Sequence, residues 1–508
     1  MTEYMKRGDI ATGVVGETTF PNHGSINVEG TRVKVKGVLP GQEIEAAIKR
    51  SSKEKAEGIL RRVIKPSPLE TAEPACPQFG ICGSCTLQRM PYGEQLKLKE
   101  SHIRKLLSPV IRNADECQWL PIEGSPSAYE YRNKMEFTFG DEYRDGPVTL
   151  GQHRKGSMYD LVNAECCCLI DEDVRRIVRE TLRYAGESGL PFYHKMRRQG
   201  YLRHLLVRKA KITGEILVDI VTTTQTEHDW SEWAARIAAI PFEGKLRGVL
   251  HTVNDAVADT IINDGTTVLY GEDCITEKLL GLNFRISTFS FFQTNSEGAE
   301  VLYSAVRDRV LEVTGGRYGA KESAAVGTVS ERSENADEAD IKARRGVIFD
   351  LYSGTGTIGQ LLAPIARKVV GIEIVEEAVV AARANAALNG LTNCEFIAGD
   401  VLKKLDEVTE RPDFIVLDPP REGVNPKALT KILAYGVDNM VYISCKPTSL
   451  ASDLVAIQDA GYRVVSVQPI DLFPQTPHVE TVCCLYHQKK DFISVPYEPK
   501  DASYLKQS

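Results

Sequence analysis

The chain is 508 residues long, which is enough for about three domains. Its 42% hydrophobic and 26% charged residues are those of an ordinary soluble globular protein. A formal net charge of −7 excludes a protein that binds nucleic acid through an overall positive charge, so any contact with RNA must depend on local basic surfaces.

The expected compartment follows from the apolar segments and the cysteines. No apolar run approaches the roughly 20 residues of a membrane span, and the first ten residues are charged and contain no signal-peptide core. We therefore expect a cytoplasmic monomer with no membrane contact and no obligate protein partner. In that compartment the twelve cysteines indicate metal binding or catalysis, and not disulfides.

Residues 1–66 alternate short β-rich runs with turns, which is typical of a small barrel. Residues 1–65 contain twelve Lys and Arg and eight Asp and Glu, so this segment carries a charge of +4 within an acidic chain. Its later basic residues are Lys49, Arg50, Lys53, Lys55, Arg61 and Arg62. A solvated hairpin would show the same charges, but a basic barrel at the head of an enzyme more often binds an oligonucleotide.

Three cysteines lie close together in a loop rich in Pro and Gly: Cys76, Cys82 and Cys85. The turns of such a loop allow several thiolates to surround one centre. A zinc site would usually add a second C-x2-C pair or histidines, and neither follows at a typical interval. The spacing therefore favours an iron–sulfur cluster with a distant fourth ligand, for which the candidates are Cys166, Cys167 and Cys168.

Residues 67–280 are predicted to form a central, largely antiparallel β domain, although a helix at about 93–108 is a candidate to pack on the C-terminal domain. A strand at 129–140 interleaves aromatic residues with Arg and Lys, which can stack on and neutralise single-stranded RNA. A half-buried strand would show the same pattern. Residues 315–345 are poor in apolar residues and are predicted to be a flexible surface insertion.

The stretch from Val347 to Gly359 is the feature around which the C-terminal part is organised. It begins as a strand buried on both faces, turns at Gly354 and Gly356, and continues into an apolar run that can begin a helix. Glu373 ends the next predicted strand, about twenty residues later, which is the usual position of a carboxylate that binds a ribose. The glycines do not match G-x-G-x-x-G in register after the strand, and the sequence contains no Gly-Lys-Ser/Thr phosphate-binding loop. With Asp350 before the turn, the pattern indicates S-adenosylmethionine; a tight turn in another doubly wound domain is the alternative.

Regular βα alternation is predicted from here to the end of the chain. The predicted strands are Val347–Leu351, Val369–Glu373, Cys394–Ile397, Phe414–Leu417, Asn439–Ile443, Arg463–Val467 and Thr481–Tyr486. Asp418 directly follows one of them, and Ser444 and Cys445 follow another. Ligands of open α/β sheets bind outside the carboxyl ends of the strands, so Asp418 and Cys445 should face the same crevice as the glycines.

Cys445 is a candidate nucleophile. It lies beside Lys446 and near the predicted start of a helix, and both features predict a lowered thiol pKa. The segment from His478 to Glu480 follows a Pro-rich loop and offers a base. The alternative is a small, inert, buried thiol at Cys445.

These motifs together resemble those of the bacterial RNA (uracil-5-)-methyltransferases, and specifically the iron–sulfur branch that acts on 23S ribosomal RNA and carries an N-terminal TRAM domain. The likeness covers nearly the whole chain outside residues 315–345. The matching segments are Phe291–Asn295, Asp350–Thr357, Asp418–Arg421, Ser444–Pro447 and His478–Thr481.

The resemblance implies an α/β protein in three parts. These are a TRAM or OB-like RNA-binding barrel at 1–66, a central α+β iron–sulfur and RNA-binding domain at 67–280, and a Rossmann-like class I methyltransferase domain at 281–508. It implies Cys445 as nucleophile and Glu480 as base. It implies S-adenosylmethionine binding by Gln293, Tyr352, Thr357, Glu373, Asp400 and Asp418. A 4Fe–4S cluster would be held by Cys76, Cys82, Cys85 and Cys167, with Cys166 and Cys168 as alternatives to the last.

The expected activity is the S-adenosylmethionine-dependent formation of 5-methyluridine in 23S ribosomal RNA. C5 of uracil is a weak nucleophile, but addition of the Cys445 thiolate at C6 makes C5 enolate-like, and a base can then remove the C5 proton. The target base must first be turned out of folded RNA. Two alternatives are the same chemistry on transfer RNA and a non-catalytic RNA-binding iron–sulfur protein. The clustered cysteines and the barrel favour ribosomal RNA, and the intact Cys445 and Glu480 argue against a protein without activity.

Overall fold

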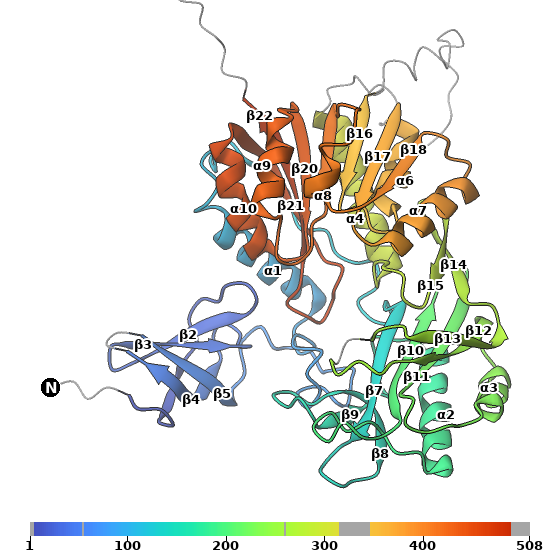
Figure 1. Ribbon diagram of the computed structural model, residues 1–508. Coiled ribbons are helices and arrows are strands. Elements are labelled where there is room, and N and C mark those ends of the chain that lie inside the picture. The colour runs from blue at the N-terminus through green and yellow to red at the C-terminus, as the bar shows by residue number, and fades with distance from the viewer. Residues whose placement is uncertain (1–4, 53–54, 259–260, 314–345, 489–508) are drawn as a thin grey trace, which may run out of the picture.

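The computed structural model describes residues 5–52, 55–258, 261–313 and 346–488, and these form three parts (Figure 1). An N-terminal sheet and a central sheet with its helices lie side by side below a C-terminal α/β layer. The predicted insertion at 315–345 lies outside the described residues. Within the described ranges, no helix is both long and apolar enough to cross a membrane.

The N-terminal part is a five-stranded sheet in the order β1-β4-β5-β3-β2. Its strands are β1 (Ile10–Val14), β2 (His23–Val28), β3 (Thr31–Lys36), β4 (Glu43–Ser51) and β5 (Lys55–Lys65). Successive side chains of a strand point to opposite faces. On β3, Val33 and Val35 are therefore buried in the core of the sheet, while Arg32, Lys34 and Lys36 are exposed.

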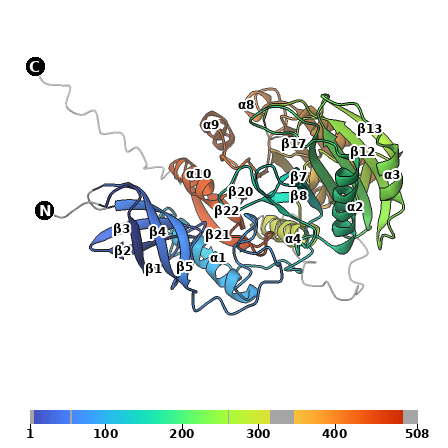
Figure 2. The ribbon, with the colours of Figure 1, turned by 90° about the horizontal axis from the view of Figure 1, so that it is seen from below.

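Helix α1 (Tyr92–Leu107) joins the N-terminal sheet to the C-terminal layer, and Figure 2 shows it between them. Thr18 Oγ1 lies 2.8 Å from Nε2 of the buried His102. On the other side, Ile103 and Leu107 belong to the core of the C-terminal layer. The short strand β6 (Gln118–Trp119) then adds to the edge of the C-terminal sheet, parallel to β21 (Tyr462–Ile470). Helix α1 thus packs on the C-terminal part, although it precedes the central sheet in the sequence.

The central part is a seven-stranded sheet in the order β13-β12-β11-β10-β7-β8-β9, antiparallel except for the β11–β12 pair. Its elements are β7 (Lys134–Asp141), β8 (Val148–His153), β9 (Leu161–Asn163), α2 (Glu172–Ser188), β10 (Leu202–Lys209), β11 (Glu215–Thr222), α3 (Ser231–Ala238), β12 (Lys245–Val253) and β13 (Gly265–Gly271). Ile177 of α2 and Trp233 of α3 pack into its core.

The strand predicted at 129–140 begins later, at Lys134, as β7, and most of its aromatic rings lie in the core. Tyr131, Phe137 and Phe139 are all buried, with relative exposures of 3% or less. Because these rings are packed inside the protein, they are not available to stack on bases. The stacking interpretation is therefore wrong for these three rings, and the alternative of a half-buried strand is correct for β7.

A hairpin and a long helix connect the central sheet to the C-terminal layer. They are β14 (Cys274–Leu279), β15 (Leu282–Ser287) and α4 (Ser296–Val313). Phe284 and Ile286 share a core with the C-terminal strands. The backbone N–H of Arg285 also donates to Oδ1 of Asn385, which lies on α7. The hairpin is thus fastened to the layer that follows it in the sequence.

The C-terminal sheet has eight strands in the order β18-β17-β16-β19-β20-β22-β21-β6. Its strands are β16 (Val347–Leu351), β17 (Lys368–Glu373), β18 (Cys394–Ala398), β19 (Phe414–Leu417), β20 (Asn439–Ser444), β21 (Tyr462–Ile470) and β22 (Glu480–His487). Its helices are α6 (Thr357–Leu362), η1 (Ala363–Ile365), α7 (Glu376–Leu388), α8 (Val401–Lys404), α9 (Pro426–Ala434) and α10 (Pro447–Asp459). All seven predicted strands are confirmed to within a few residues.

Both faces of this sheet are covered by helices, as the continuous apolar runs predict. Ile348 of β16 belongs to the core that contains α4 and α6, whereas Phe349 belongs to the core that contains α1, α9 and α10. The strand is fully buried along its whole length. The polar side chains of this layer that can meet a ligand are therefore expected mainly at the strand ends.

Candidate functional site

The carboxyl edge of the C-terminal sheet brings the candidate residues into one row. From β17 to β22, the strand order places Glu373, Tyr352, Asp418, Cys445 and Glu480 one after another. Strands β17 and β18 lie on one side of β16, and β19 and β20 lie on the other, so the strand order reverses between the neighbouring strands β16 and β19. Open α/β sheets bind their ligands outside the carboxyl ends of the strands at such a point.

Strand direction explains why Cys445 and Glu480 meet. Strand β22 runs antiparallel to β20, and Ser444 pairs with Thr481. The carboxyl end of β20 therefore lies beside the amino end of β22, where Glu480 is the first residue. Residues 35 positions apart in the sequence are neighbours at the same edge because of this one pairing.

The row borders a cleft of about 1560 Å³. This is larger than the 300–1,000 Å³ of most small-molecule pockets, so it has room for more than one ligand. The predicted residues that line it are Gln293, Tyr352, Thr357, Glu373, Asp418, Cys445 and Glu480. The structure thus brings together seven of the eight predicted residues of the catalytic and S-adenosylmethionine sites.

The eighth, Asp400, is missing from the described residues that line the cleft. It follows β18, the outermost strand on that side, and its side chain accepts a 2.8 Å hydrogen bond from the backbone N–H of Leu402 at the start of α8. Its contact with a cofactor stays a prediction.

The turn after β16 is built on close approach of the backbone. Gly356 has a φ of 71°, and a Cβ at this position would lie 2.6 Å from Phe396. Gly359 approaches Asp350 behind the turn, where its backbone N–H donates a 2.8 Å hydrogen bond to Asp350 Oδ2. Asp350 is fully buried and does not belong to the described residues that line the cleft. Asp350 therefore holds the turn in place from behind.

Two residues near the turn have a constrained position. Glu373 accepts hydrogen bonds from the backbone N–H groups of Gly354 (2.9 Å) and Val375 (3.0 Å). Tyr352 has a φ of 68°, a conformation that costs a bulky residue on the order of 1–3 kcal/mol and that clusters at functional sites. Both side chains line the cleft.

Burial dominates the electrostatics of the catalytic side. The pKa of Glu480 is raised to about 8, first by burial and then by the charge of Asp418, and Arg421 opposes this shift. Burial also raises the pKa of Asp418 to about 7, with a further contribution from Asp350. These carboxyl groups therefore titrate near neutral pH, which suits groups that exchange protons in a reaction.

The pKa of Cys445 is raised to about 11, so the predicted lowering is wrong. Burial is the largest cause, and the charges of Glu480 and Asp418 add to it, while Arg421 opposes them. Lys446 follows in the sequence, but its side chain is exposed. Proximity in sequence therefore predicted the wrong direction, because burial and the nearby carboxylates of Glu480 and Asp418 determine the pKa of this thiol.

Sequence reasoning missed several residues of the cleft. Tyr303 of α4 lines it, and its hydroxyl is hydrogen-bonded to the side chain of Gln293. Phe473 also lines it and packs edge-to-face on His478, with ring centroids 6.3 Å apart. An apolar helix position and a loop phenylalanine carry no signal that distinguishes them from core residues, so neither could be identified from spacing.

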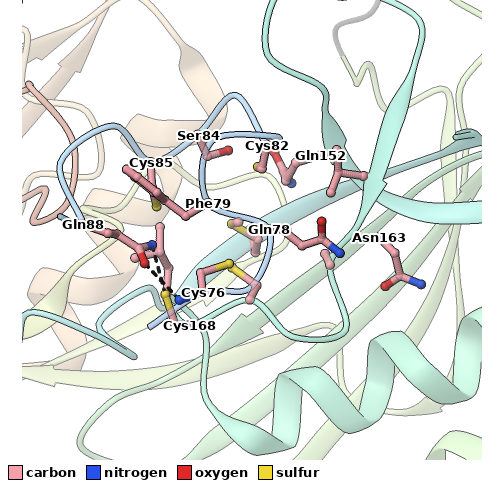
Figure 3. A pocket seen from close by; sticks show the side chains of 15 residues that line it. Cys76, Gln78, Phe79, Cys82, Ser84, Cys85, Gln88, Gln152, Asn163 and Cys168 are labelled. Carbon is pink, nitrogen blue, oxygen red and sulfur yellow. Dashed lines mark hydrogen bonds between the residues drawn. The ribbon is translucent and has the colours of Figure 1, made fainter. Parts of the chain in front are cut away.

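A second pocket collects the clustered cysteines (Figure 3). Its lining includes Cys76, Cys82, Cys85, Cys167 and Cys168, which come from two distant segments. The exposed Cys166 does not belong to the described lining residues. The pKa of Cys76 is lowered to about 6, mainly by a hydrogen bond from the thiol of Cys168. The two cysteine segments therefore lie together, as predicted, and both Cys167 and Cys168 line the pocket that they form.

The donor set of this pocket fits a soft metal centre, because thiolates are the ligands preferred by zinc and iron–sulfur clusters. No His, Asp or Glu belongs to the described lining residues. In the described part of the chain, no group of three or more His, Cys, Asp or Glu is spaced to hold a single metal ion. The iron–sulfur cluster thus stays a prediction.

Comparison with known proteins gives a consistent result. Residues 334–489 match the family model described as tRNA (uracil-5-)-methyltransferase. The chain is 45% identical to an RNA methyltransferase of Clostridium tetani over 96% of this chain and 99% of that protein. It is 47% identical to an RNA methyltransferase of Caldanaerobacter subterraneus over 94% and 99% of the two chains.

A solved structure has a similar fold. It is the Pyrococcus abyssi tRNA (uracil-54, C5)-methyltransferase in complex with S-adenosyl-L-homocysteine, with a TM-score of 0.67 and 23% identity over 94% of this chain and all of that one. At this identity the likeness concerns the fold alone. It supports the mixed α/β architecture with a Rossmann-like C-terminal core.

The raised pKa of Cys445 predicts slow alkylation by iodoacetamide. With a pKa of about 11, roughly one thiol in a thousand is ionised at pH 8, and only the thiolate reacts. Replacing Glu480 by Gln removes a negative charge that is present mainly above pH 8, so Cys445 of Glu480→Gln should react faster than in the parent protein at pH 9.5 and almost equally at pH 7. Peptide mapping by mass spectrometry measures both rates, with the exposed Cys166 as internal reference. Alkylation of Cys445 faster than that of Cys166 at pH 8 would contradict the assignment.

Proposed function

The chain belongs to the RNA (uracil-5-)-methyltransferase family, and from this we propose that it methylates C5 of a uridine in 23S ribosomal RNA through a covalent adduct with Cys445. It is an S-adenosylmethionine-dependent RNA methyltransferase. The observation that carries the proposal is the meeting of Cys445 and Glu480 at one end of a cleft whose other end has the groups expected to bind the methyl donor.

The residues of the cleft fit S-adenosylmethionine. Glu373 offers a carboxylate at the end of β17, a position suited to a ribose diol. Gln293, Tyr352 and Asp418 add polar groups toward the reacting end, and Thr357 lies where α6 begins. When bound, S-adenosylmethionine supplies the methyl group as part of a positively charged sulfonium.

Cys445 forms the covalent bond. The thiol gives its proton to solvent, its sulfur adds to C6 of the uracil, and the electron pair displaced from the C5–C6 double bond makes C5 nucleophilic. C5 then takes the methyl group as the bond from that methyl to the sulfonium breaks, which leaves a neutral thioether. Since burial holds the thiol neutral in the free protein, ionisation must be assisted, and Arg421 is a cation that already acts in that direction. A positive sulfonium in the same cleft would act in the same direction.

Glu480 completes the cycle. Its carboxylate removes the proton from C5, the C6–S bond breaks, and the thiolate leaves as the double bond returns. A pKa of about 8 makes this group a good proton acceptor that is still partly ionised near neutral pH. Turnover should therefore rise with pH through about 8, where Glu480 loses its proton.

Two exposed surfaces support RNA as the substrate. The first is the outer face of β3, with Arg32, Lys34 and Lys36. The second joins the loops at 154–159 and 195–198, where the hydroxyl of Tyr159 contacts Met196 Sδ at 3.4 Å. The exposed residues of this second surface are Arg154, Lys155, Met158, Tyr159, Met196, Arg197 and Arg198. Basic and aromatic side chains together suit a single-stranded RNA segment.

The choice of ribosomal over transfer RNA is supported by features outside the cleft. The clustered cysteines and the basic N-terminal sheet, which we propose is a TRAM-type barrel, are those of the iron–sulfur branch of the family. We further propose that Cys76, Cys82 and Cys85 hold a 4Fe–4S cluster with Cys167, for which Cys168 is an alternative because both thiols line the pocket.

The roles of Cys445 and Glu480 predict opposite behaviour of two variants. Cys445→Ala should lose methyl transfer and form no adduct, because no sulfur then activates C5. Glu480→Gln should still form the adduct and methylate it, but proton removal should stall, so a methylated protein–RNA complex should survive denaturation. The double variant should trap nothing. Denaturing gels with RNA and methyl-labelled S-adenosylmethionine measure all three, and normal turnover by Glu480→Gln would overturn its assignment.

The same variant identifies the substrate. RNA covalently attached to Glu480→Gln in cells can be purified under denaturing conditions and sequenced up to the adduct. We expect 23S ribosomal RNA with the adduct at a uridine. Transfer RNA in its place would establish the alternative substrate and leave the chemistry unchanged.

The cysteine pocket predicts iron and sulfide in protein purified without oxygen, in a ratio of about four to four per chain. Cys76→Ala and Cys85→Ala should lose the iron, whereas Cys166→Ala should keep it because its side chain is exposed outside the pocket. Iron and sulfide analysis with zinc measured in parallel tests this. Stoichiometric zinc without sulfide would contradict the proposed cluster.

The basic face of β3 predicts a salt-dependent loss of RNA affinity on charge reversal. Lys34→Glu with Lys36→Glu should lower affinity at low salt on the order of tenfold or more, and should reduce the slope of log affinity against log salt by about 1–2. Lys245→Glu with Lys278→Glu makes the same charge change at exposed positions of β12 and β14 and serves as control. Equal losses in the two double variants would show that only the net charge matters.

A further inference from the structure

The loop at residues 471–479, which joins β21 to β22 and leads directly into Glu480, is held mostly by other parts of the chain. We name it the base loop. Oδ1 of the buried Asp471 accepts a 2.7 Å hydrogen bond from Nζ of Lys99 on α1. The same ammonium donates to the carbonyl of Phe473 at 3.1 Å. The side chain of Asn295, which directly precedes α4, donates to the carbonyl of Leu472 at 3.0 Å.

Gln475, in the middle of the base loop, makes the most contacts. It is buried, and its φ of 68° lies in the left-handed region, which a non-glycine residue occupies only when its surroundings hold it there. Its backbone N–H donates to Oε1 of Gln95 at 3.0 Å, and its own Oε1 accepts from Nε2 of Gln95 at 2.9 Å. Its Nε2 reaches the carbonyl of Ala128 at 3.4 Å. Two glutamines 380 positions apart thus form a reciprocal pair.

The carbonyl of Gln475 connects the base loop to the cysteine pocket. It accepts hydrogen bonds from the backbone N–H groups of Thr86 (2.9 Å) and Leu87 (3.1 Å), the two residues that follow Cys85. The next residue, Gln88, accepts from the N–H of Cys76 at 3.0 Å and donates to Sγ of Cys168 at 3.3 Å, as Figure 3 shows for the thiol contact. The segment that borders the thiols therefore also supports the base loop.

A second connection runs from the other cysteine segment. The backbone N–H of Glu130 donates to the carbonyl of Cys168 at 2.9 Å. One residue later, the hydroxyl of the buried Tyr131 donates to the carbonyl of Pro474 at 3.0 Å. Asn133 then donates to the carbonyl of Gln293, which also lines the cleft, at 2.8 Å. Two segments that border the cleft are thus hydrogen-bonded to the framework around the thiols.

We propose that Gln475 is a positioning residue for the methyl transfer, which fixes Glu480 by tying the base loop to Gln95 and to the segment that follows Cys85. It touches no substrate, because it does not belong to the described residues that line the cleft. It acts through the backbone that leads into β22. The inference rests on the proposed role of Glu480 as the base.

The kinetic test compares Gln475→Ala, Gln475→Gly and Gln458→Ala. Misplacing the base should lower kcat on the order of ten- to a hundredfold and leave KM for S-adenosylmethionine unchanged, with the methylated adduct accumulating during turnover. Glycine adopts the left-handed backbone without strain, so Gln475→Gly should melt at a higher temperature than Gln475→Ala and yet lose as much kcat. Gln458 is a matched control, since it is a buried glutamine that makes hydrogen bonds on α10, away from the cleft. A kcat that follows melting temperature across the three variants would overturn the proposal.

A second measurement needs no methyl acceptor. Amide hydrogen exchange of peptides covering 471–480 should quicken in Gln95→Ala and Gln475→Gly, while exchange in α9 should stay as in the parent protein. Removal of the proposed cluster with a chelator should cause the same change in exchange. Thr86 and Leu87, which hydrogen-bond to Gln475, directly follow the proposed ligand Cys85. Unchanged exchange at 471–480 in the two variants would refute the positioning role. If exchange changes but no variant, Glu480→Gln included, forms an adduct, the proposed reaction is wrong and the loop support is not.

Discussion

The antiparallel entry of β22 beside β20 is the constraint on which the site depends. In a purely parallel sheet, every strand would present only its carboxyl end at the cleft, and a residue at the start of a strand would lie at the opposite edge. Because Ser444 pairs with Thr481, Glu480 at the start of β22 lies beside Cys445 at the end of β20. The proposed nucleophile and the proposed base are therefore held by one ladder of backbone hydrogen bonds, which fixes their separation more firmly than two loops would.

That geometry has an electrostatic consequence. Glu480 and Asp418 both face the cleft, and Asp350 lies buried behind it, so each carboxylate makes ionisation of the next one, and of the Cys445 thiol, less favourable. Arg421 opposes these shifts at both Cys445 and Glu480. A site of this kind favours a positively charged ligand, because bringing a cation into a buried set of acids offsets their mutual repulsion. S-adenosylmethionine is such a ligand, and in the proposed mechanism its positive charge would favour ionisation of the Cys445 thiol.

The parts predicted well from the sequence are those determined by local pattern. Buried strands such as Val347–Leu351 are continuous apolar runs, and a polar residue directly after such a run, as at Asp418 or Cys445, must lie at the sheet edge. The failures all concern three-dimensional neighbours. Lys446 is adjacent to Cys445 in sequence, but the pKa of the thiol responds to acids from two other strand ends. The aromatic residues of the strand at 129–140 alternate as they would on an RNA-binding face, yet they pack in the core, and nothing in the alternation tells the two apart.

Helix α1 shows why the remaining connections could not be predicted. Lys99 and Asp471 form a buried ion pair between segments 372 positions apart, and no local pattern marks either residue. Such pairs contribute little net stability, because the cost of removing two charges from water offsets their attraction. The pair instead favours one packing of α1 against the base loop. Any other packing would leave the buried ammonium of Lys99 without its carboxylate, which is strongly unfavourable. Because Gln95 lies one helical turn from Lys99 and pairs with Gln475, a single face of α1 defines where the base loop must lie. The catalytic edge of the C-terminal sheet is therefore completed only when the segment that follows the cysteine loop is in place.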